Sequence, residues 1–183
     1  MPPLDPLHEL SRVERGTDLD DALAFYDTLS PVTIDTMIGA WRGSGIPTGS
    51  PFDGLLENVG WHGKRFERAD SGHPLVFSTG RGRLVSLDPG RMPIGLAARH
   101  GQRFLGRASA VAFRVVRPLL TTRRPRARLR LVEYRGVVTA AMSYDQLPII
   151  DVFRAVDSDT VVGAMDMRGL ERPYLFVLRR EAG

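Results

Sequence analysis

A chain of 183 residues can bury a hydrophobic core without metals or disulfides as staples. It contains no cysteine, which excludes disulfide bonds and thiolate chemistry and fits a reducing cytoplasm. The formal net charge is +4, but Lys64 is the only lysine among 25 basic residues, and this arginine bias fits a GC-rich genome as well as it fits phosphate binding.

The first 36 residues are predicted to contain one helix. Residues 1–16 combine early prolines with mixed charges, so we expect a poorly ordered tail or a strap across the fold. Neither a signal peptide nor an apolar run of the roughly 20 residues that span a bilayer is present, so we expect a cytoplasmic protein with no transmembrane segment. Thr17 and Asp20 then resemble a capping box, and apolar residues at helical spacing follow as far as Ser30. This helix is expected to close one end of the fold.

Residues 37–45 read Met-Ile-Gly-Ala-Trp-Arg-Gly-Ser-Gly, in which three glycines and Trp41 share one face of an extended segment. The glycines leave that face bare, so another part of the chain can approach closely, while Trp41 supplies a large apolar ring. The pattern predicts the first strand of a small closed barrel, with Trp41 as a plug at one end. A direct contact between Trp41 and a ligand is the alternative.

A second short helix is predicted after Asp53, which we expect to cap it. The run Gly-Trp-His-Gly-Lys follows at residues 60–64, and its two glycines predict a tight exit into the next strand. Trp61, His62 and Lys64 are expected to lie together beside the mouth of the barrel. There they either contact a ligand or serve only packing and solvation.

From His73 onward, short alternating runs predict antiparallel strands at residues 75–79 and 83–87, closed by a turn at 88–90. Residues 96–117 depart from this alternation, because at 3.6 residues per turn their arginines fall on one side and their apolar residues on the other. We predict one long basic amphipathic helix ended by Pro118. Interleaved aromatics and a nucleic-acid module are both missing, so we favour a solvated face over a contact with nucleic acid or a membrane surface.

The C-terminal third again has the pattern of strands. Turn residues separate the apolar runs, with Gly136 at a bend or bulge and Gly169 at a later turn. The predicted strands cover residues 126–135, 137–144, 149–156, 160–167 and 174–179.

The motif at residues 37–45 resembles the one that defines the bacterial GXWXG family, in which it is joined to a C-terminal domain of unknown function. The runs VEYRG at 132–136, YDQLPI at 144–149 and MDMRG at 165–169 resemble that second part, so the likeness covers roughly residues 17–180. More distantly, the chain resembles the calycins, which are the lipocalins, fatty-acid-binding proteins and nitrobindins. In nitrobindins a histidine near the C-terminus ligates haem iron, whereas no histidine follows His100 here.

We therefore expect a mostly β fold, an antiparallel calycin-like β-barrel with short N-terminal helices and one inserted helix. A single barrel domain is expected to span residues 1–183. Within it, residues 17–70 form the GXWXG part and residues 120–180 supply the C-terminal strands of the same barrel.

The candidate site residues are those that a barrel could turn toward its lumen, since alternation sends about half of the polar residues on strands inward. A tyrosine beside a carboxylate can bind a carbonyl or hydroxyl group, and burial raises the pKa of a carboxyl group so that it can transfer a proton at neutral pH. Surface ion pairs are the alternative for the charged candidates. The candidates for catalysis are Asp145, Tyr144 and Glu133; those for ligand binding are Trp41, Trp61, His62, Lys64, Arg135, Asp151 and Asp166.

The sequence lacks the patterns of a metal site, a catalytic serine and a phosphate-binding loop. The four histidines are scattered without the spacing of a metal site, the Gly-x-Ser-x-Gly motif is missing, and no glycine run opens a helix as a phosphate loop does. We expect no metal and no cofactor.

Three functions remain. We expect the lumen to bind a small, largely apolar or amphipathic organic molecule, because barrels of this size leave room for one such ligand. The alternative is a cofactor-independent isomerase, lyase or cyclase that uses an inward carboxylate and a tyrosine. The second alternative is a nitrobindin-like haem protein that uses His62, His73 or His100. No nucleic acid partner is expected, and a homodimer is compatible with the sequence.

Overall fold

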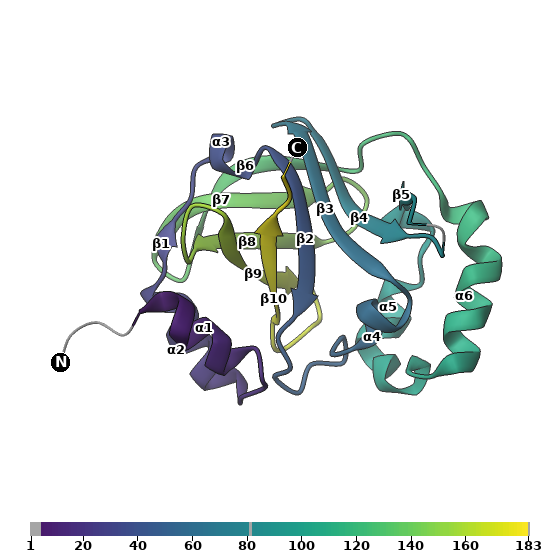
Figure 1. The fold of residues 1–183 in the computed structure, drawn as a ribbon, viewed down its shortest axis with the longest axis horizontal. Helices are drawn as coiled ribbons and strands as arrows, with labels where there is room; N and C mark the ends of the chain where they lie inside the picture. Colours follow the sequence, from purple (N-terminus) through teal and green to yellow (C-terminus); the bar gives the residue numbers. More distant parts are fainter. Residues whose placement is uncertain (1–4, 81, 183) are drawn as a thin grey trace.

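The computed structural model describes residues 5–80 and 82–182, and its centre is a closed antiparallel barrel of eight strands (Figure 1). The mostly β, calycin-like fold predicted from the sequence is confirmed. Around the barrel the strand order is β8-β7-β6-β4-β3-β2-β10-β9, and pairing between β8 and β9 closes the ring. The barrel strands are β2 (Gly39–Gly45), β3 (Trp61–Arg68), β4 (Ser71–Ser78), β6 (Ala127–Tyr134), β7 (Val137–Tyr144), β8 (Ile149–Ala155), β9 (Thr160–Met167) and β10 (Tyr174–Arg180).

Two short strands lie outside this ring. β1 (Ser30–Pro31) pairs with β8, and β5 (Leu84–Ser86) pairs with β4. The ring is weakest between β4 and β6, which are joined by the single pair Gly72 and Ala127. The insertion between β5 and β6 leaves the barrel on this side of the ring.

The glycine-rich strand β2 has the predicted conformation, and its bare face admits a ring. A Cβ atom at Gly43 would lie 2.2 Å from the Trp61 indole, so only glycine fits there without a shift. Trp41 on the same strand is fully buried, its indole N–H donates to the Met37 carbonyl at 2.8 Å, and the Arg180 guanidinium lies over its ring. The Trp41 side chain is therefore held by the chain itself.

The N-terminal region differs from the prediction. Residues 1–4 lie outside the described residues, but the expected tail contains a helix, α1 (Pro6–Val13), whose first turn is capped by the Asp5 carboxylate. α1 is ordered because Leu10 and Val13 are buried against the rest of the molecule. The prediction of a poorly ordered segment was therefore wrong for residues 6–13.

The predicted helix before Ser30 is present as α2 (Leu19–Thr28), but its position is not at a barrel end. With α1 it packs on the outer face of β9 and β10, where Val162 and Leu175 would otherwise be exposed (Figure 1). Its cap is Asp18, which accepts the Asp21 N–H at 2.9 Å, and not Thr17. The helix therefore covers the outside of the sheet.

Two further one-turn helices are α3 (Ile34–Met37) and α4 (Leu55–Asn58). Asp53 does not cap α4, because Gly54 stands at the capping position with φ +71°. Instead the Asp53 carboxylate accepts three backbone N–H groups of the preceding loop, at residues 48–50. The loop is thereby tied to the start of α4.

The insertion is broken into several elements, so the prediction of one long helix over 96–117 was wrong. It contains η1 (Pro89–Arg91), α5 (Ile94–His100), η2 (Gly101–Phe104) and α6 (Arg107–Leu120). The chain passes so close to Pro51 that a Cβ at Gly101 would lie 2.0 Å from that carbonyl, and Gly106 has φ +135°, which no helix accommodates. Pro118 lies inside α6, which ends two residues later. Within the described residues, no helix combines the length and apolarity needed to cross a membrane.

Candidate functional site

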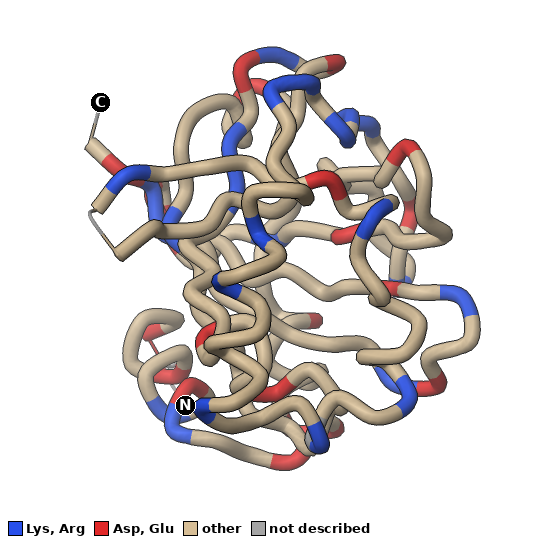
Figure 2. Tube along the Cα trace, turned by 90° about the vertical axis from the view of Figure 1, so that its right-hand side faces the viewer, with Lys and Arg blue, Asp and Glu red and all other residues tan. Residues whose placement is uncertain are grey.

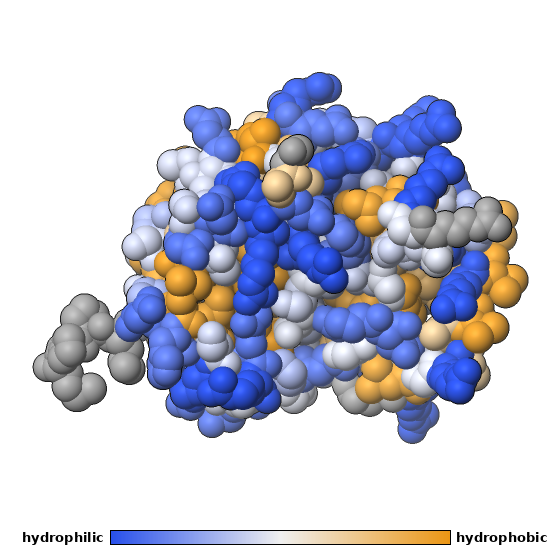
Figure 3. Space-filling model, in the orientation of Figure 1, coloured by the Kyte–Doolittle hydropathy of each residue, from blue (hydrophilic) through white to orange (hydrophobic). Residues whose placement is uncertain are grey.

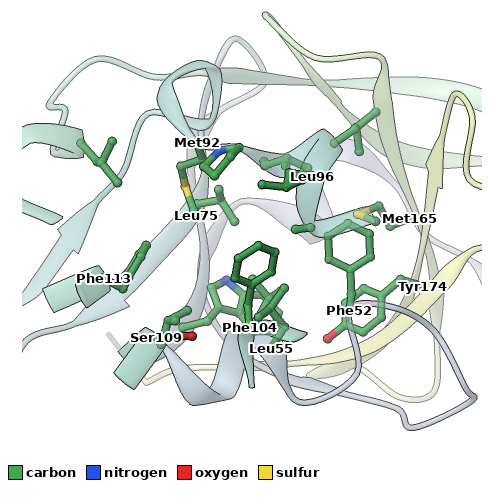
Figure 4. Close-up of a pocket in the computed structure, with 18 of the residues that line it drawn as sticks. Phe52, Leu55, Leu75, Met92, Leu96, Phe104, Ser109, Phe113, Met165 and Tyr174 are labelled. Atoms are coloured by element: carbon green, nitrogen blue, oxygen red, sulfur yellow. The ribbon is translucent and has the colours of Figure 1, made fainter. Parts of the chain in front are cut away.

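A cavity of about 600 Å³ lies between the barrel lumen and the inserted segment (Figure 4). Figure 4 shows Phe52 and Tyr174 at one side of it, Phe113 of α6 at the other, and Phe104 between them. Nearly all of its lining is apolar. Cavities of roughly 300–1,000 Å³ with such a lining are typical of small-molecule sites.

The polar part of the lining is centred on a buried ion pair. Lys64 on β3 and Asp151 on β8 meet with Nζ 2.7 Å from Oδ2, and their side chains are only 3% and 1% exposed. The ammonium also donates to the Pro74 carbonyl at 3.2 Å and lies 4.9 Å from the centre of the Phe176 ring. Lys64 is thus held by a carboxylate, a carbonyl and an aromatic face.

A bulge in β3 allows both Trp61 and Lys64 to face the cavity. Strict alternation would send two residues three positions apart to opposite faces of a strand. The pairing of β3 with β4 shifts register on both sides of Gly63, which has φ +155°, and the shift restores Lys64 to the inner side. A Cβ at Gly63 would lie 1.9 Å from the Trp41 carbonyl oxygen, so the bulge requires glycine.

Two tyrosines of the lining add hydroxyl groups, that of Tyr144 beside the ion pair and that of Tyr174 beside Gly45 and Glu57. The Tyr144 hydroxyl lies 3.5 Å from Asp151 Oδ2, at the limit of a hydrogen bond. The Tyr174 hydroxyl and Asp151 Oδ1 are buried, and neither has a hydrogen-bond partner among the described residues. Buried polar atoms are usually paired, so these two are the atoms that a bound molecule could satisfy.

Burial determines the protonation of this cluster. It raises the pKa of Asp151, a shift that the ammonium of Lys64 partly offsets. It also raises the pKa of Tyr144 and of Tyr174 well above 10; the charge of Asp151 adds to the shift of Tyr144, and the charges of Glu57 and Asp53 add more than that of Asp151 to the shift of Tyr174. Both tyrosines are therefore neutral donors at neutral pH.

The structure places the other charged candidates on the surface. Asp145 follows the end of β7 and pairs with Arg128 at 2.8 Å, so it turns away from Tyr144. Arg135, at the turn after β6, makes two 2.6 Å hydrogen bonds to the Asp27 carboxylate. Glu133 and Asp166 are exposed. These four residues do not line the cavity.

Trp41 and His62 also lie apart from the cavity lining. Trp41 is buried under α3 and is bonded to Met37, and His62 Nε2 lies 2.8 Å from Glu181 near the C-terminus. Of the ten candidates, the structure thus brings together Trp61, Lys64, Tyr144 and Asp151.

Tyr174 and Phe176 were not among the candidates. They lie two positions apart on the last strand, so both side chains point to the same face, and both line the cavity. The Tyr-x-Phe spacing on a predicted strand carries the signal that could have found them. The contribution of α6 carries no such signal, because Phe113 faces inward while other apolar side chains of the same helix, such as Val115 and Leu119, are exposed.

The cavity lining does not fit a nitrobindin-like haem site. It contains no histidine: His62 is paired with Glu181, His73 is buried elsewhere on β4, and His100 is exposed at the end of α5. Among the described residues there is also no group of three potential metal ligands.

A closed eight-stranded barrel whose inner residues help to line an apolar cavity has the architecture of a calycin-like protein. The model of the GXWXG protein family matches residues 24–82, and that of a domain of unknown function, DUF4334, matches residues 125–180. A crystal structure of a protein from Thermomonospora curvata is 32% identical to this chain and superposes with a TM-score of 0.72, covering 98% of this chain and 100% of its own. No protein with a curated description matches. The chain belongs to the GXWXG family with the C-terminal DUF4334 domain.

Proposed function

We propose that the barrel binds one small, largely apolar organic molecule that carries a hydroxyl or carbonyl group. The observation behind this proposal is the combination of an apolar cavity of about 600 Å³ with two unsatisfied polar atoms, Asp151 Oδ1 and the Tyr174 hydroxyl. The apolar body of the ligand would replace water against the rings and aliphatic side chains. A ligand hydroxyl group could donate to Asp151 Oδ1 or accept from the Tyr174 hydroxyl, whereas a carbonyl group could only accept from the Tyr174 hydroxyl.

A matched set of ligands tests this proposal. Dodecanol, a methyl ketone of equal length and dodecane are each used to displace a fluorescent anilinonaphthalene sulfonate probe. The alcohol and the ketone should bind more tightly than dodecane, by about the tenfold that one net hydrogen bond provides. Tyr174→Phe should reduce the preference for both polar compounds and Asp151→Asn the preference for the alcohol, whereas Asp145→Asn serves as a control that leaves both preferences unchanged. Equal affinity for all three compounds would contradict the polar end of the proposal.

A second candidate function is acid–base catalysis at the same cluster, in an isomerase, lyase or cyclase without a cofactor. It is favoured by the raised pKa of Asp151 and by the position of the Tyr144 hydroxyl 3.5 Å from the same carboxyl group. In this reading Asp151 moves a proton on the bound molecule, and Tyr144 supports the charge that develops on the carboxyl group or the ligand oxygen.

The two candidates differ in one measurement. Compounds that co-purify with the protein, and the bound members of the ligand set, are followed by mass spectrometry for chemical conversion. If the protein is an enzyme, Asp151→Asn should lower turnover by about 10² to 10⁴. Conversion that continues undiminished in this variant would exclude Asp151 as the acid or base. No conversion of any bound compound would favour the binding protein.

A further inference from the structure

Helix α6 exposes a row of large aliphatic side chains. Val111, Val115 and Leu119 are 57%, 73% and 74% exposed, and their spacing of four residues aligns them along one face of the helix. We call these three residues the apolar ridge. Figure 3 shows hydrophobic side chains along the edge of the molecule formed by α6. Aliphatic side chains exposed in a row are typical of a surface that binds a partner, because their burial against that partner is favourable.

The opposite face of the same helix lines the cavity. Phe113, Val116 and Leu120 belong to the cavity lining, while the apolar ridge does not. A single helix therefore separates the proposed ligand from the surroundings of the ridge. A partner that covers the ridge would lie directly over the wall of the ligand cavity.

The surroundings of the ridge are strongly basic. Residues 89–132 contain eleven of the 25 basic residues and none of the 21 acidic ones, and four of the eleven pair with carboxylates outside the segment, namely Arg91, Arg126, Arg128 and Arg130. Figure 2 looks onto the side of the molecule on which α6 lies in Figure 1 and shows basic positions there, with acidic ones among them. Arg107 and Arg114 of α6 are exposed beside the ridge, and neither forms an ion pair with another described residue. A partner of the ridge must therefore combine an apolar interior with negative charge.

We propose that the apolar ridge docks on the surface of a bilayer that contains anionic phospholipids. The ridge would enter the boundary between head groups and acyl chains, and the arginines around it would contact the phosphates. A second copy of the chain fits less well, because a two-fold symmetric contact through this face would set the same arginines against each other. A nucleic acid would match the arginines but leave the ridge uncovered. The bilayer would also be a source or acceptor for an apolar ligand, although the docking itself does not depend on the ligand.

Vesicle flotation tests this proposal on the full chain. Vesicles of phosphatidylglycerol mixed with phosphatidylcholine should carry the protein, whereas pure phosphatidylcholine and high salt should each reduce binding by about tenfold or more. Val111→Ser/Val115→Ser/Leu119→Ser and Arg107→Gln/Arg114→Gln should each reduce binding to anionic vesicles by about tenfold. Circular dichroism and thermal melting confirm that each variant is folded.

Matched controls use residues of the same kind elsewhere on the surface. Leu131→Ser/Val138→Ser removes two exposed aliphatic side chains from β6 and β7, and Arg42→Gln/Arg172→Gln removes two exposed arginines outside the basic segment. Both controls should bind vesicles as the wild type does. Failure of the wild type to bind anionic vesicles, or equal binding by the ridge variant, would overturn the proposal. A dimer in solution that the ridge variant dissociates would also overturn it and assign the ridge to a second copy.

Discussion

Lys64 and Asp151 join opposite walls of the barrel, since β3 and β8 are not neighbours in the strand order, and yet Nζ and Oδ2 are 2.7 Å apart. The pair lies inside the lumen, with its charges removed from water. Such a pair repays its desolvation only if both partners are present. It therefore fixes the polar end of the cavity in one arrangement.

The first prediction concerns this pair. Lys64→Met and Asp151→Asn should each lower the free energy of unfolding by about 3–5 kcal/mol, because each leaves one buried polar group without its partner. The double variant Lys64→Met/Asp151→Asn should lose less than the sum of the two, because no buried charge is left. Guanidinium unfolding of all four proteins gives the comparison. Additive losses would show that the two side chains do not interact.

The second prediction concerns the space left by Gly43. Because a Cβ there would lie 2.2 Å from the Trp61 ring, Gly43→Ala should lower the free energy of unfolding by about 1–3 kcal/mol. Gly95→Ala is the matched control: Gly95 lies in α5, and no described atom outside its own surroundings is within 4 Å of the added Cβ. The control should be neutral or stabilising by up to about 1 kcal/mol. Urea unfolding that finds the Gly43 variant as stable as the wild type would contradict the close packing of Trp61.

The third prediction concerns pH. Burial lowers the pKa of His73 below 6.5, and the charge of Arg65 adds to this shift. The unfolded chain then binds a proton at higher pH than the folded one. The contribution of His73 to the stability of the folded protein is fully present above the pKa that this residue has in the unfolded chain. It is lost as the pH falls toward and through the pKa that His73 has in the folded protein.

Urea unfolding between about pH 7 and pH 5 should therefore show a falling stability in the wild type and a smaller fall in His73→Gln. His100→Gln is the control, because its ring is exposed in the structure and its change should leave the fall as it is in the wild type. Equal slopes in the wild type and His73→Gln would show that the histidine is not buried in its neutral form.

The fourth prediction concerns haem. The cavity lining contains no histidine, so protein expressed with added haem should not show a stoichiometric Soret band. A stable ferric complex that is lost on changing His62, His73 or His100 to Ala would contradict the geometry of the cavity.

The strands could be predicted because their signals are local. Alternation and turn residues identified all five strands after residue 125, and the glycine spacing identified β2. The break in the insertion was missed because it depends on the approach of Gly101 to Pro51, which is a contact in space. The placement of α2 was missed because its apolar face gives no sign of whether it meets a barrel end or the outer face of β9 and β10.

The candidate site could be predicted only in part, for similar reasons. Asp151 and Tyr144 share an inward parity on adjacent strands, which alternation can indicate. The side chain of Lys64 reaches these two residues only because of the bulge at Gly63, and no pattern in the sequence predicts that shift of register. Asp145 and Tyr144 are neighbours in sequence, and the ordinary pleat of a strand separates them. The partners of a lumen residue come from across the barrel, where sequence spacing carries no information.

The location of the ligand is the central claim, and a variant that fills the cavity tests it most directly. Met165 on β9 lines the cavity, so Met165→Trp should place a larger ring in part of the space of the proposed ligand (Figure 4). Calorimetric titration with dodecanol should give one site per chain in the wild type and an affinity weaker by about tenfold or more in Met165→Trp, with circular dichroism showing that the variant is folded. Dodecanol binding of equal affinity in the folded variant would contradict a site in the lumen.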